Sequence, residues 1–444
     1  MTAPTSAENT FQIPLHPDAP LQVHSLGILG TTSTRSAFLN AITRPVFEAK
    51  TAGNVSDCIK DMAGKLQRHD IFTNIKVTVA TNQSVNDAID VIVNMEEKPQ
   101  SVFLTSLGVG DNEMNLKGGL AVRNVLGGAE TVETTFSFGN RTKAALEGSV
   151  GMPINASPDA RVSLFANAAK KDYSMINFYD ESSKAAGVRF NGCSKYGHHE
   201  LSYALTHRDI TAHTKSSSTV RAQSGENVKS SIYHSFVCDT RDRVAAPTSG
   251  HYFGVFQEFA GLGQRGDASF LKQEVIGQYH KTLVGDEKAS FRVVLSTHAK
   301  AGVLTAFDNK GVNVSDRFYL GGPLSLRGFK MGGIGSRDNN DALGGGAYWA
   351  AGASLISDVP GAPELPIKLH AFVNAGNIAD HSQGTNFKAT AESLAQEPRT
   401  SAGVGLVFLH AIARVEANFC IPLQHRTGDI AQPGFQLGFG LNFL

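Results

Sequence analysis

The chain has 444 residues, and 40 Lys and Arg balance 40 Asp and Glu, so its formal net charge is zero. A neutral balance argues against nucleic-acid binding through a global positive field, and 18% charged residues with 45 glycines do not suit a disordered chain. The longest non-polar stretch, about twelve residues from Ala342 to Ala353, is shorter than the roughly twenty that a spanning helix needs.

The first twenty residues are rich in Pro, Ser, Thr and Ala without periodicity, and we expect a disordered tail over 1–20. This end has no basic region followed by an apolar one, so we do not expect a secretory signal. In residues 21–99, by contrast, some segments have apolar residues at helical spacing and others alternate apolar and polar residues as a strand does. The order strand, helix, helix, strand, strand is predicted for Leu21–Gly30, Thr34–Lys50, Val55–His69, Phe72–Val79 and Ala88–Met95.

Residues 100–444 form a train of segments of about ten residues in which apolar and polar side chains alternate. In Ile412–Leu423, for example, Arg414 and Glu416 alternate with apolar neighbours. We count sixteen such segments, with no convincing helix between them.

Two architectures accommodate this pattern. A soluble β-sandwich or propeller would bury the apolar faces, whereas a transmembrane β-barrel would turn them toward lipid around a polar lumen. Charges on the second face favour the barrel, because they could not all fill a dry sandwich core. These charges are Arg161, Arg292, Lys300, Arg414 and Glu416. A soluble all-β protein remains the alternative.

Other motifs carry little functional weight. Gly261–Gly266 matches GxGxxG but lacks a strand–helix context, so we interpret it as a turn between strands. His198, His199 and Glu200 with His207 lack a metal-ligand spacing. The four cysteines are far apart, and we expect no metal site, no disulfide framework and no cofactor.

The long gap at about 301–343 carries the most specific signal. It contains Phe-Tyr-Leu-Gly-Gly-Pro-Leu-Ser-Leu-Arg-Gly-Phe, ending in Leu326, Arg327, Gly328 and Phe329. An apolar loop tip with one guanidinium is suited to folding back into a cavity, where the donors of Arg327 can be satisfied. This motif resembles the lumen-loop motif of the superfamily of β-barrel assembly proteins that carry polypeptide-transport-associated (POTRA) domains.

Further segments agree with this resemblance. The order of elements in 21–99 resembles one POTRA domain, and Cys238–Arg243 resembles the superfamily's D-T-R-D turn. Phe372, Asn374 and Gly376 match the strand that receives the loop arginine, and alternation turns Phe372 and Asn374 into the lumen. Bacterial members carry Asp where this chain has Asn374, so we expect Arg327 to meet a neutral acceptor.

One POTRA domain, no signal and sixteen strands look like the central barrel subunit of the mitochondrial sorting and assembly machinery. The last segment fits the polar-x-Gly-x-x-hydrophobic-x-hydrophobic sorting signal of mitochondrial barrels, through Gln436, Gly438, Leu441 and Phe443, with Gly440 further weakening the strand. The resemblance implies a lateral gate between this strand and the first one, which carries Val102, Leu104, Ser106 and Gly108.

The resemblance thus implies a mainly β protein, with a 16-stranded antiparallel transmembrane barrel over 100–444 preceded by a POTRA domain over 21–99. It implies no enzyme, but an insertase for β-barrel precursors in the mitochondrial outer membrane, with the POTRA domain facing the intermembrane space. Implied partners are the precursors, peripheral subunits on the cytosolic face, membrane lipids and a second barrel copy, and no nucleic acid. A polypeptide-translocating channel and a passive diffusion channel remain the alternatives.

Overall fold

A computed structural model describes residues 16–82, 84–85, 87–110, 113–264, 266–285, 291–308, 311–362, 364–381, 387–410 and 413–440. The chain divides into two compact units. The first comprises Met1–Phe103, Leu120–Glu133 and Ser149–Ser163, and the second comprises Leu104–Gly119, Thr134–Gly148 and Leu164–Leu444.

The N-terminal part of the first unit is a three-stranded sheet with two helices. The strand order is β1-β3-β2, with β1 parallel and β2 antiparallel to the central β3. This is the predicted element order, and it fits a POTRA domain. The elements are β1 (Gln22–Leu29), α1 (Ser36–Glu48), α2 (Ala52–Arg68), β2 (Phe72–Thr81) and β3 (Ala88–Glu97).

The core of this region is apolar. Val55 and Leu66 of α2 are 0% exposed, as are Val46 of α1 and Val91 and Val93 of β3. The hydrophobic effect on these side chains holds the helices to the sheet. The start of α2 is capped by the residue before it, Thr51, whose side chain accepts a hydrogen bond from a backbone N–H in the first turn.

The tail expected over 1–20 needs correction at its end. Residues 1–15 lie outside the described residues, but residues 16–20 are bonded to the start of α2. The backbone N–H groups of Ala52 and Gly53 donate to the carbonyls of Ala19 and Pro17, both at 2.9 Å. These carbonyls satisfy N–H groups that have no partner inside the helix.

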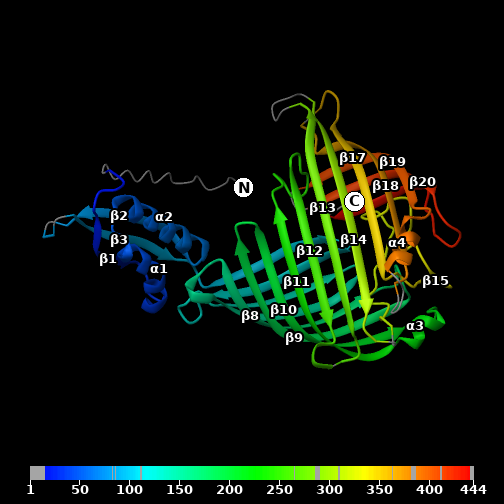
Figure 1. Ribbon diagram of the computed structural model, residues 1–444, viewed down its shortest axis with the longest axis horizontal. Coiled ribbons are helices and arrows are strands. Elements are labelled where there is room, and N and C mark those ends of the chain that lie inside the picture. The colour runs from blue at the N-terminus through cyan, green and yellow to red at the C-terminus, as the bar shows by residue number, and fades with distance from the viewer. Residues whose placement is uncertain are drawn as a thin grey trace. The chain divides into compact units, whose positions relative to one another are not determined.

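The rest of the chain is dominated by a 16-stranded sheet, which Figure 1 shows curling into a barrel. The strand number and the antiparallel fold class predicted from the sequence are confirmed. The strands are β4 (Ser101–Gly110), β5 (Glu113–Arg123), β6 (Thr131–Gly139), β7 (Thr142–Pro153), β8 (Ala160–Asp172), β9 (Tyr179–Ser194), β10 (Gly197–Ala212), β11 (Gly225–Asp239), β12 (Gly250–Ala260), β13 (Phe270–Val284), β14 (Val293–Ala306), β17 (Ala347–Asp358), β18 (Ile367–Ala379), β19 (Arg399–His410), β20 (Ala413–Gln424) and β21 (Gly434–Gly440).

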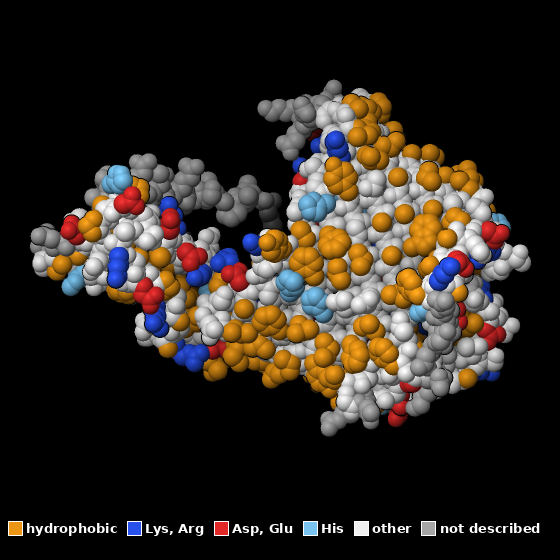
Figure 2. All heavy atoms as spheres, in the orientation of Figure 1, with side chains coloured by type: hydrophobic (Ala, Val, Ile, Leu, Met, Phe, Trp, Pro, Cys, Tyr) orange, Lys and Arg blue, Asp and Glu red, His pale blue; other side chains and the backbone are white. Residues whose placement is uncertain are grey.

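The strands alternate between two faces, as predicted. On β18, Leu369 and Val373 are 40% and 56% exposed, whereas Phe372 and Asn374 are 3% and 0% exposed. Figure 2 shows the outward face, where hydrophobic side chains spread over the strands with few charges among them. An apolar outside with a polar inside is the pattern of a barrel that faces lipid.

Sequence reasoning missed two helices within this sheet's connections, because each is too short for a clear helical stripe. They are α3 (Ser218–Ala222), between β10 and β11, and α4 (Phe387–Ala395), between β18 and β19. Short 3₁₀ turns occur at Ile154–Ala156 and Leu262–Gln264. The expected loop of 301–343 begins later, because β14 continues to Ala306, and it contains the small strands β15 (Arg337–Asp338) and β16 (Asp341–Ala342).

Candidate functional site

The loop between β14 and β17 packs against the inner wall of the barrel. Leu320, Leu326, Phe329 and Ile334 are at most 2% exposed and share one apolar cluster with wall residues such as Phe270. The tip of the loop turns at Gly328, whose φ of 83° is a left-handed conformation that favours glycine. The loop therefore has a core of its own inside the lumen.

Arg327 projects from this loop tip and is 0% exposed. Its Nε donates to Glu416 Oε2 at 3.0 Å, and its second terminal nitrogen lies 2.9 Å from the same oxygen. Its other terminal nitrogen donates to Asn374, whose amide oxygen lies 3.1 Å away when the amide is oriented to face it. The guanidinium also stacks over the ring of Phe372, 4.8 Å from its centroid.

The expected contact of Arg327 with the neutral Asn374 is present, but Arg327 also has a charged partner that was not expected. Asn374 does contact it, but the charged partner is Glu416 on β20, two strands further along the sheet. A buried guanidinium without a counter-charge would be costly, so the anion missing from β18 is supplied from another strand. The sequence carried a signal for this, because alternation turns Glu416 to the lumen together with Arg414.

Glu416 is the centre of a buried network. It is 0% exposed, and it pairs with Arg414 as well as with Arg327. Asn418 donates to Glu416 Oε2 at 2.8 Å and contacts His370 Nδ1 at 3.0 Å. Two cations, an amide and an imidazole thus surround one carboxylate, which makes this corner of the lumen rigid and dependent on charge.

A second buried ion cluster holds the start of the loop. Asp316 accepts hydrogen bonds from two nitrogens of Arg208 at 2.9 and 3.0 Å, and from Lys229 at 3.1 Å. Burial alone would raise the pKa of Asp316, but the cations of Lys229 and Arg208 lower this pKa to about 2. Sequence reasoning assigned no role to Asp316, and the loop is therefore fixed at two points rather than one.

The loop tip also contacts the last strand. Gly328 N–H donates to Gln436 Oε1 at 3.0 Å, and Gln436 Nε2 donates to the carbonyl of Phe329 at 2.9 Å. Just before β21, Gln432 N–H donates to the carbonyl of Gly328 at 2.7 Å. The structure thus brings the predicted loop motif together with one of the predicted last-strand residues.

The remaining predicted residues fall into three groups. Gly376 on β18 allows close approach of the loop, because a Cβ there would lie 2.9 Å from Leu326 Cδ1. Gly438 and Gly440 lie on β21 opposite Glu416 and Arg414, whereas Leu441 and Phe443 lie outside the described residues. The first-strand residues Val102, Leu104, Ser106 and Gly108 lie on β4, at the opposite end of the strand order from β21.

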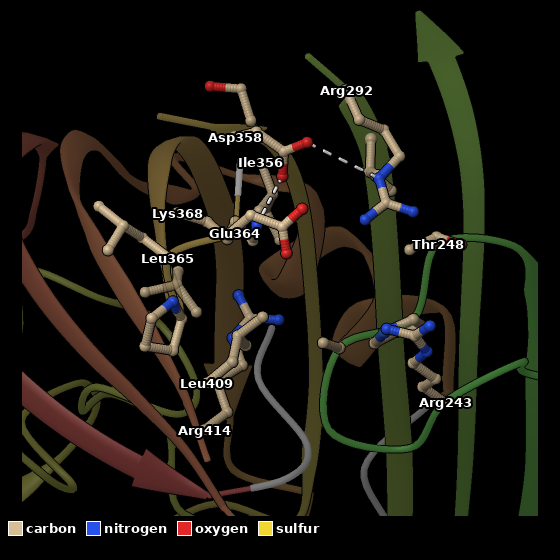
Figure 3. Close-up of a pocket in the computed structure, with 16 residues that line it drawn as sticks. Arg243, Thr248, Arg292, Ile356, Asp358, Glu364, Leu365, Lys368, Leu409 and Arg414 are labelled. Atoms are coloured by element: carbon tan, nitrogen blue, oxygen red, sulfur yellow. Dashed lines mark ion pairs between the residues drawn. The ribbon is translucent and has the colours of Figure 1, made fainter. Parts of the chain in front are cut away.

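A cavity of about 260 Å³ lies at the barrel end where β17 and β19 finish and β18 and β20 begin (Figure 3). Lys368 pairs with Asp358 at 2.7 Å, and Arg292 lies 3.9 Å from the same carboxylate. Arg414 lines the cavity and connects it to the Glu416 network. The predicted charges Arg292 and Arg414 therefore both face the lumen side.

Over the part of the chain that the structure describes, no group of three or more His, Cys, Asp or Glu side chains is arranged to hold a metal ion. Within the same residues, no helix is both long enough and apolar enough to cross a membrane. The Gly261–Gly266 segment lies between β12 and β13, as expected for a connection between strands.

Comparisons with known proteins agree with this geometry. The Omp85 superfamily domain matches residues 124–443. A SAM50-like protein of Schizosaccharomyces pombe is 33% identical over 99% of this chain and 95% of its own length. The human sorting and assembly machinery component 50 homolog is also 33% identical, over 90% of this chain and 85% of its own. Among solved structures, BamA from Haemophilus ducreyi lacking POTRA domains 1–3 has a TM-score of 0.74 at 16% identity, over 94% of this chain and 84% of that one.

Proposed function

This chain belongs to the Omp85 superfamily and, within it, to the sorting and assembly machinery component 50 family, and on that premise we propose that it inserts β-barrel precursors through a gate between β4 and β21. A role in β-barrel assembly, rather than enzymatic catalysis, follows from the family. The gate, the mitochondrial outer membrane as its location and the roles of the site residues are parts of the proposal.

The physical problem is the precursor's backbone. Each N–H or C=O that reaches hydrocarbon without a partner costs several kcal/mol, so a bare strand cannot enter lipid. A barrel whose seam opens can pair such a strand along its own edge, which is β-augmentation. The free energy of folding then drives insertion, and neither a nucleotide nor a cofactor is needed.

The observation that carries the proposal is the arrangement at β21. This strand ends the sheet, and over the residues that the structure describes it pairs with β20 from Gly434, opposite Cys420, to Gly440, opposite Arg414, seven residues in all. Three of those seven residues are glycine, which weakens a strand. The loop, by contrast, is anchored to β20 and to the barrel wall by buried ion pairs. A replaceable last strand thus lies beside a firmly held loop.

In the proposed cycle, the precursor's C-terminal strand displaces β21 and pairs with β4, and later hairpins form at the gate. Residues 21–99 act as a POTRA domain in the intermembrane space, and residues 100–444 form the barrel. The partners are precursors with a C-terminal sorting signal, peripheral subunits on the cytosolic face, lipids and a second barrel copy.

Two cysteine experiments test the gate. A cysteine at Leu104 of β4 is expected to cross-link to the last strand of an arrested precursor, whereas a cysteine at the outward-facing Leu205 of β10 is not. A disulfide between Ala417→Cys and Leu437→Cys, which lie opposite each other on β20 and β21, is expected to block assembly until it is reduced.

The matched control for this lock is a disulfide between Tyr203→Cys and Ile232→Cys, opposite each other on β10 and β11. It is expected to leave assembly unchanged under oxidising conditions. Assembly at the normal rate with the β20–β21 lock closed, or no adduct at β4 although the precursor binds, would overturn the gate.

A further inference from the structure

We propose that the loop tip at Gly328 and Phe329 is a receptor for a carboxamide side chain, filled at rest by Gln436 and offered to the polar residue of an incoming precursor strand. The inference deepens the proposed function and rests on it, because the precursor strand must take the place of β21. It assigns to the loop tip the selection of a residue type, in addition to holding the barrel in shape.

The two contacts define the chemistry of the ligand. The receptor presents one donor, Gly328 N–H, and one acceptor, the Phe329 carbonyl. The amide oxygen of Gln436 accepts from the first at 3.0 Å, and its amide nitrogen donates to the second at 2.9 Å. A carboxylate has acceptors only and would face the Phe329 carbonyl without a donor. An aliphatic side chain would leave both backbone groups unpaired.

The site is buried, which gives this match its selectivity. Gln436 is 6% exposed and Phe329 is 0% exposed, so water has little access to replace a missing partner. A buried donor or acceptor left without a hydrogen bond carries its full desolvation cost, whereas a satisfied one contributes modestly. An occupant without the amide therefore loses more binding free energy at this site than an occupant with the amide gains.

Most contacts that shape the receptor lie outside β21, although residues 430–432, just before this strand, are also hydrogen-bonded to the loop. Leu326 and Phe329 are packed into an apolar cluster with residues of β13, β14 and β17, and Arg327 between them is paired with Glu416 on β20. Gly328 adopts its left-handed conformation within this fixed frame. If β21 leaves, the donor and the acceptor remain in place with their partner removed, which favours the binding of a replacement amide.

The neighbouring positions add a second requirement. Along β21, the lumen-facing residues after Gln436 are Gly438, opposite Glu416, and Gly440, opposite Arg414. A Cβ at Gly440 would lie 2.9 Å from a side-chain carbon of Leu324 in the loop, so a small residue is favoured at this point. The loop thus fits a strand that presents an amide and, at the position of Gly440, a small residue on the same face.

The experiment uses the full chain in membranes and a barrel precursor whose last two strands are residues 413–444 of this chain. The chain carries Ala417→Cys, and the precursor carries Leu437→Cys, so a disulfide forms only when the precursor strand lies where β21 lies now. In the precursor, Gln436→Leu and Gln436→Glu are each expected to lower the adduct yield about tenfold. Leucine loses both buried hydrogen bonds, whereas glutamate loses the one to the Phe329 carbonyl and places a carboxylate against that oxygen.

The same substitution in the chain itself should act in the opposite direction. Gln436→Leu there weakens the resident strand's hold on the loop tip, so an unmodified precursor should give several times more adduct. The matched control is Gln278→Leu, since Gln278 is a buried lumen glutamine, 5% exposed, whose amide contacts Arg241 instead of the loop. A merely structural role of Gln436 would lower the adduct yield in both arrangements.

The outcomes separate the two levels of the proposal. Equal yields from the precursor that keeps Gln436 and from the precursor with Gln436→Leu, while adducts still form, would overturn the amide receptor and leave the exchange intact. The absence of adducts from every precursor would overturn the exchange itself. The precursor variants keep the test valid if the substituted chain folds poorly, because they are used with an unmodified Gln436 in the chain.

Discussion

The N-terminal α+β region and the barrel differ in their interiors, because, over the residues that the structure describes, only the barrel buries a network of charged side chains. In the first, Val46, Val55 and Leu66 are 0% exposed and the interior is apolar. In the second, the ion-paired Arg327 and Glu416 are 0% exposed beside the loop's apolar cluster, and many apolar side chains of the strands face outward. The difference follows from the surroundings, since one region must turn its polar groups to water and the other must turn its apolar groups to lipid.

The contrast also concerns how each interior fails. An apolar core loses stability gradually as contacts are removed, because each side chain contributes its own share. A buried ionic network fails as a unit, since deleting one partner leaves another charge buried without compensation. The barrel's loop should therefore be sensitive to single charge changes that the N-terminal region tolerates.

The largest effect is expected from Glu416→Gln. This change leaves the buried cations of Arg327 and Arg414 facing a neutral amide, and we expect a loss of about 3–5 kcal/mol of barrel stability. To measure it, samples are heated to increasing temperatures before a detergent gel, and the temperature at which the band of the compact, folded barrel disappears is recorded. The loop should become accessible to protease at the same time.

The matched control lies in the N-terminal region. Glu48→Gln breaks an ion pair with Arg44 on α1 in which both side chains are more than half exposed, and its effect should be only a few tenths of a kcal/mol. If Glu416→Gln were as mild as Glu48→Gln, the lumen network would not hold the loop.

A second comparison uses one substitution on two apolar surfaces. Val404 of β19 and Leu29 of β1 are 61% and 56% exposed. Val404→Lys should cost the barrel about 2–4 kcal/mol, because a cation near the bilayer midplane is destabilising. Leu29→Lys should stay within about 0.5 kcal/mol, because that surface meets water. Reversible unfolding of the barrel in lipid vesicles measures the first, and hydrogen exchange of the N-terminal region measures the second.

Equal tolerance of both lysines would contradict the assignment of opposite solvents to the two surfaces. Ser401→Lys is a control on the same strand. It should also lower barrel stability, but through burial on the lumen face, where Ser401 is 0% exposed. Only the Val404 variant should regain stability in thinner bilayers, where its side chain can reach the interface.

How far the sequence could predict the structure depends on the range of the interaction. The helical spacing of Ile59 and Met62 and the alternation of Phe372 and Asn374 are local, and both were predicted correctly. The pairing of Arg327 with Glu416 was not, since it joins residues 89 positions apart whose proximity depends on the register of several strands. The anchoring of Asp316 was missed for the same reason.

The smallest effect is expected from acid on the N-terminal region. Glu97 accepts hydrogen bonds from the backbone N–H groups of Ser33 and Thr34, at 3.1 and 2.9 Å, and from their hydroxyls. Partial burial would raise the pKa of Glu97, but the bonds from Ser33 and Thr34 outweigh it and lower the pKa to about 2. The folded-state pKa is thus below the unfolded value of about 4.3.

Because the folded-state pKa is lowered, the stability from Glu97 is fully present above about pH 5 and is lost as the pH falls toward 2. Hydrogen exchange of residues 31–36, corrected for the intrinsic pH dependence, should show this loss as faster exchange. Glu97→Gln should remove most of the acid response, whereas Glu96→Gln should retain it, because the Glu96 carboxylate accepts a hydrogen bond from the side chain of Asn74, away from this turn. An unchanged acid response in Glu97→Gln would show that another titrating group stabilises this turn. The N-terminal region and the barrel would then differ less in how their stability depends on charged groups than the structure indicates.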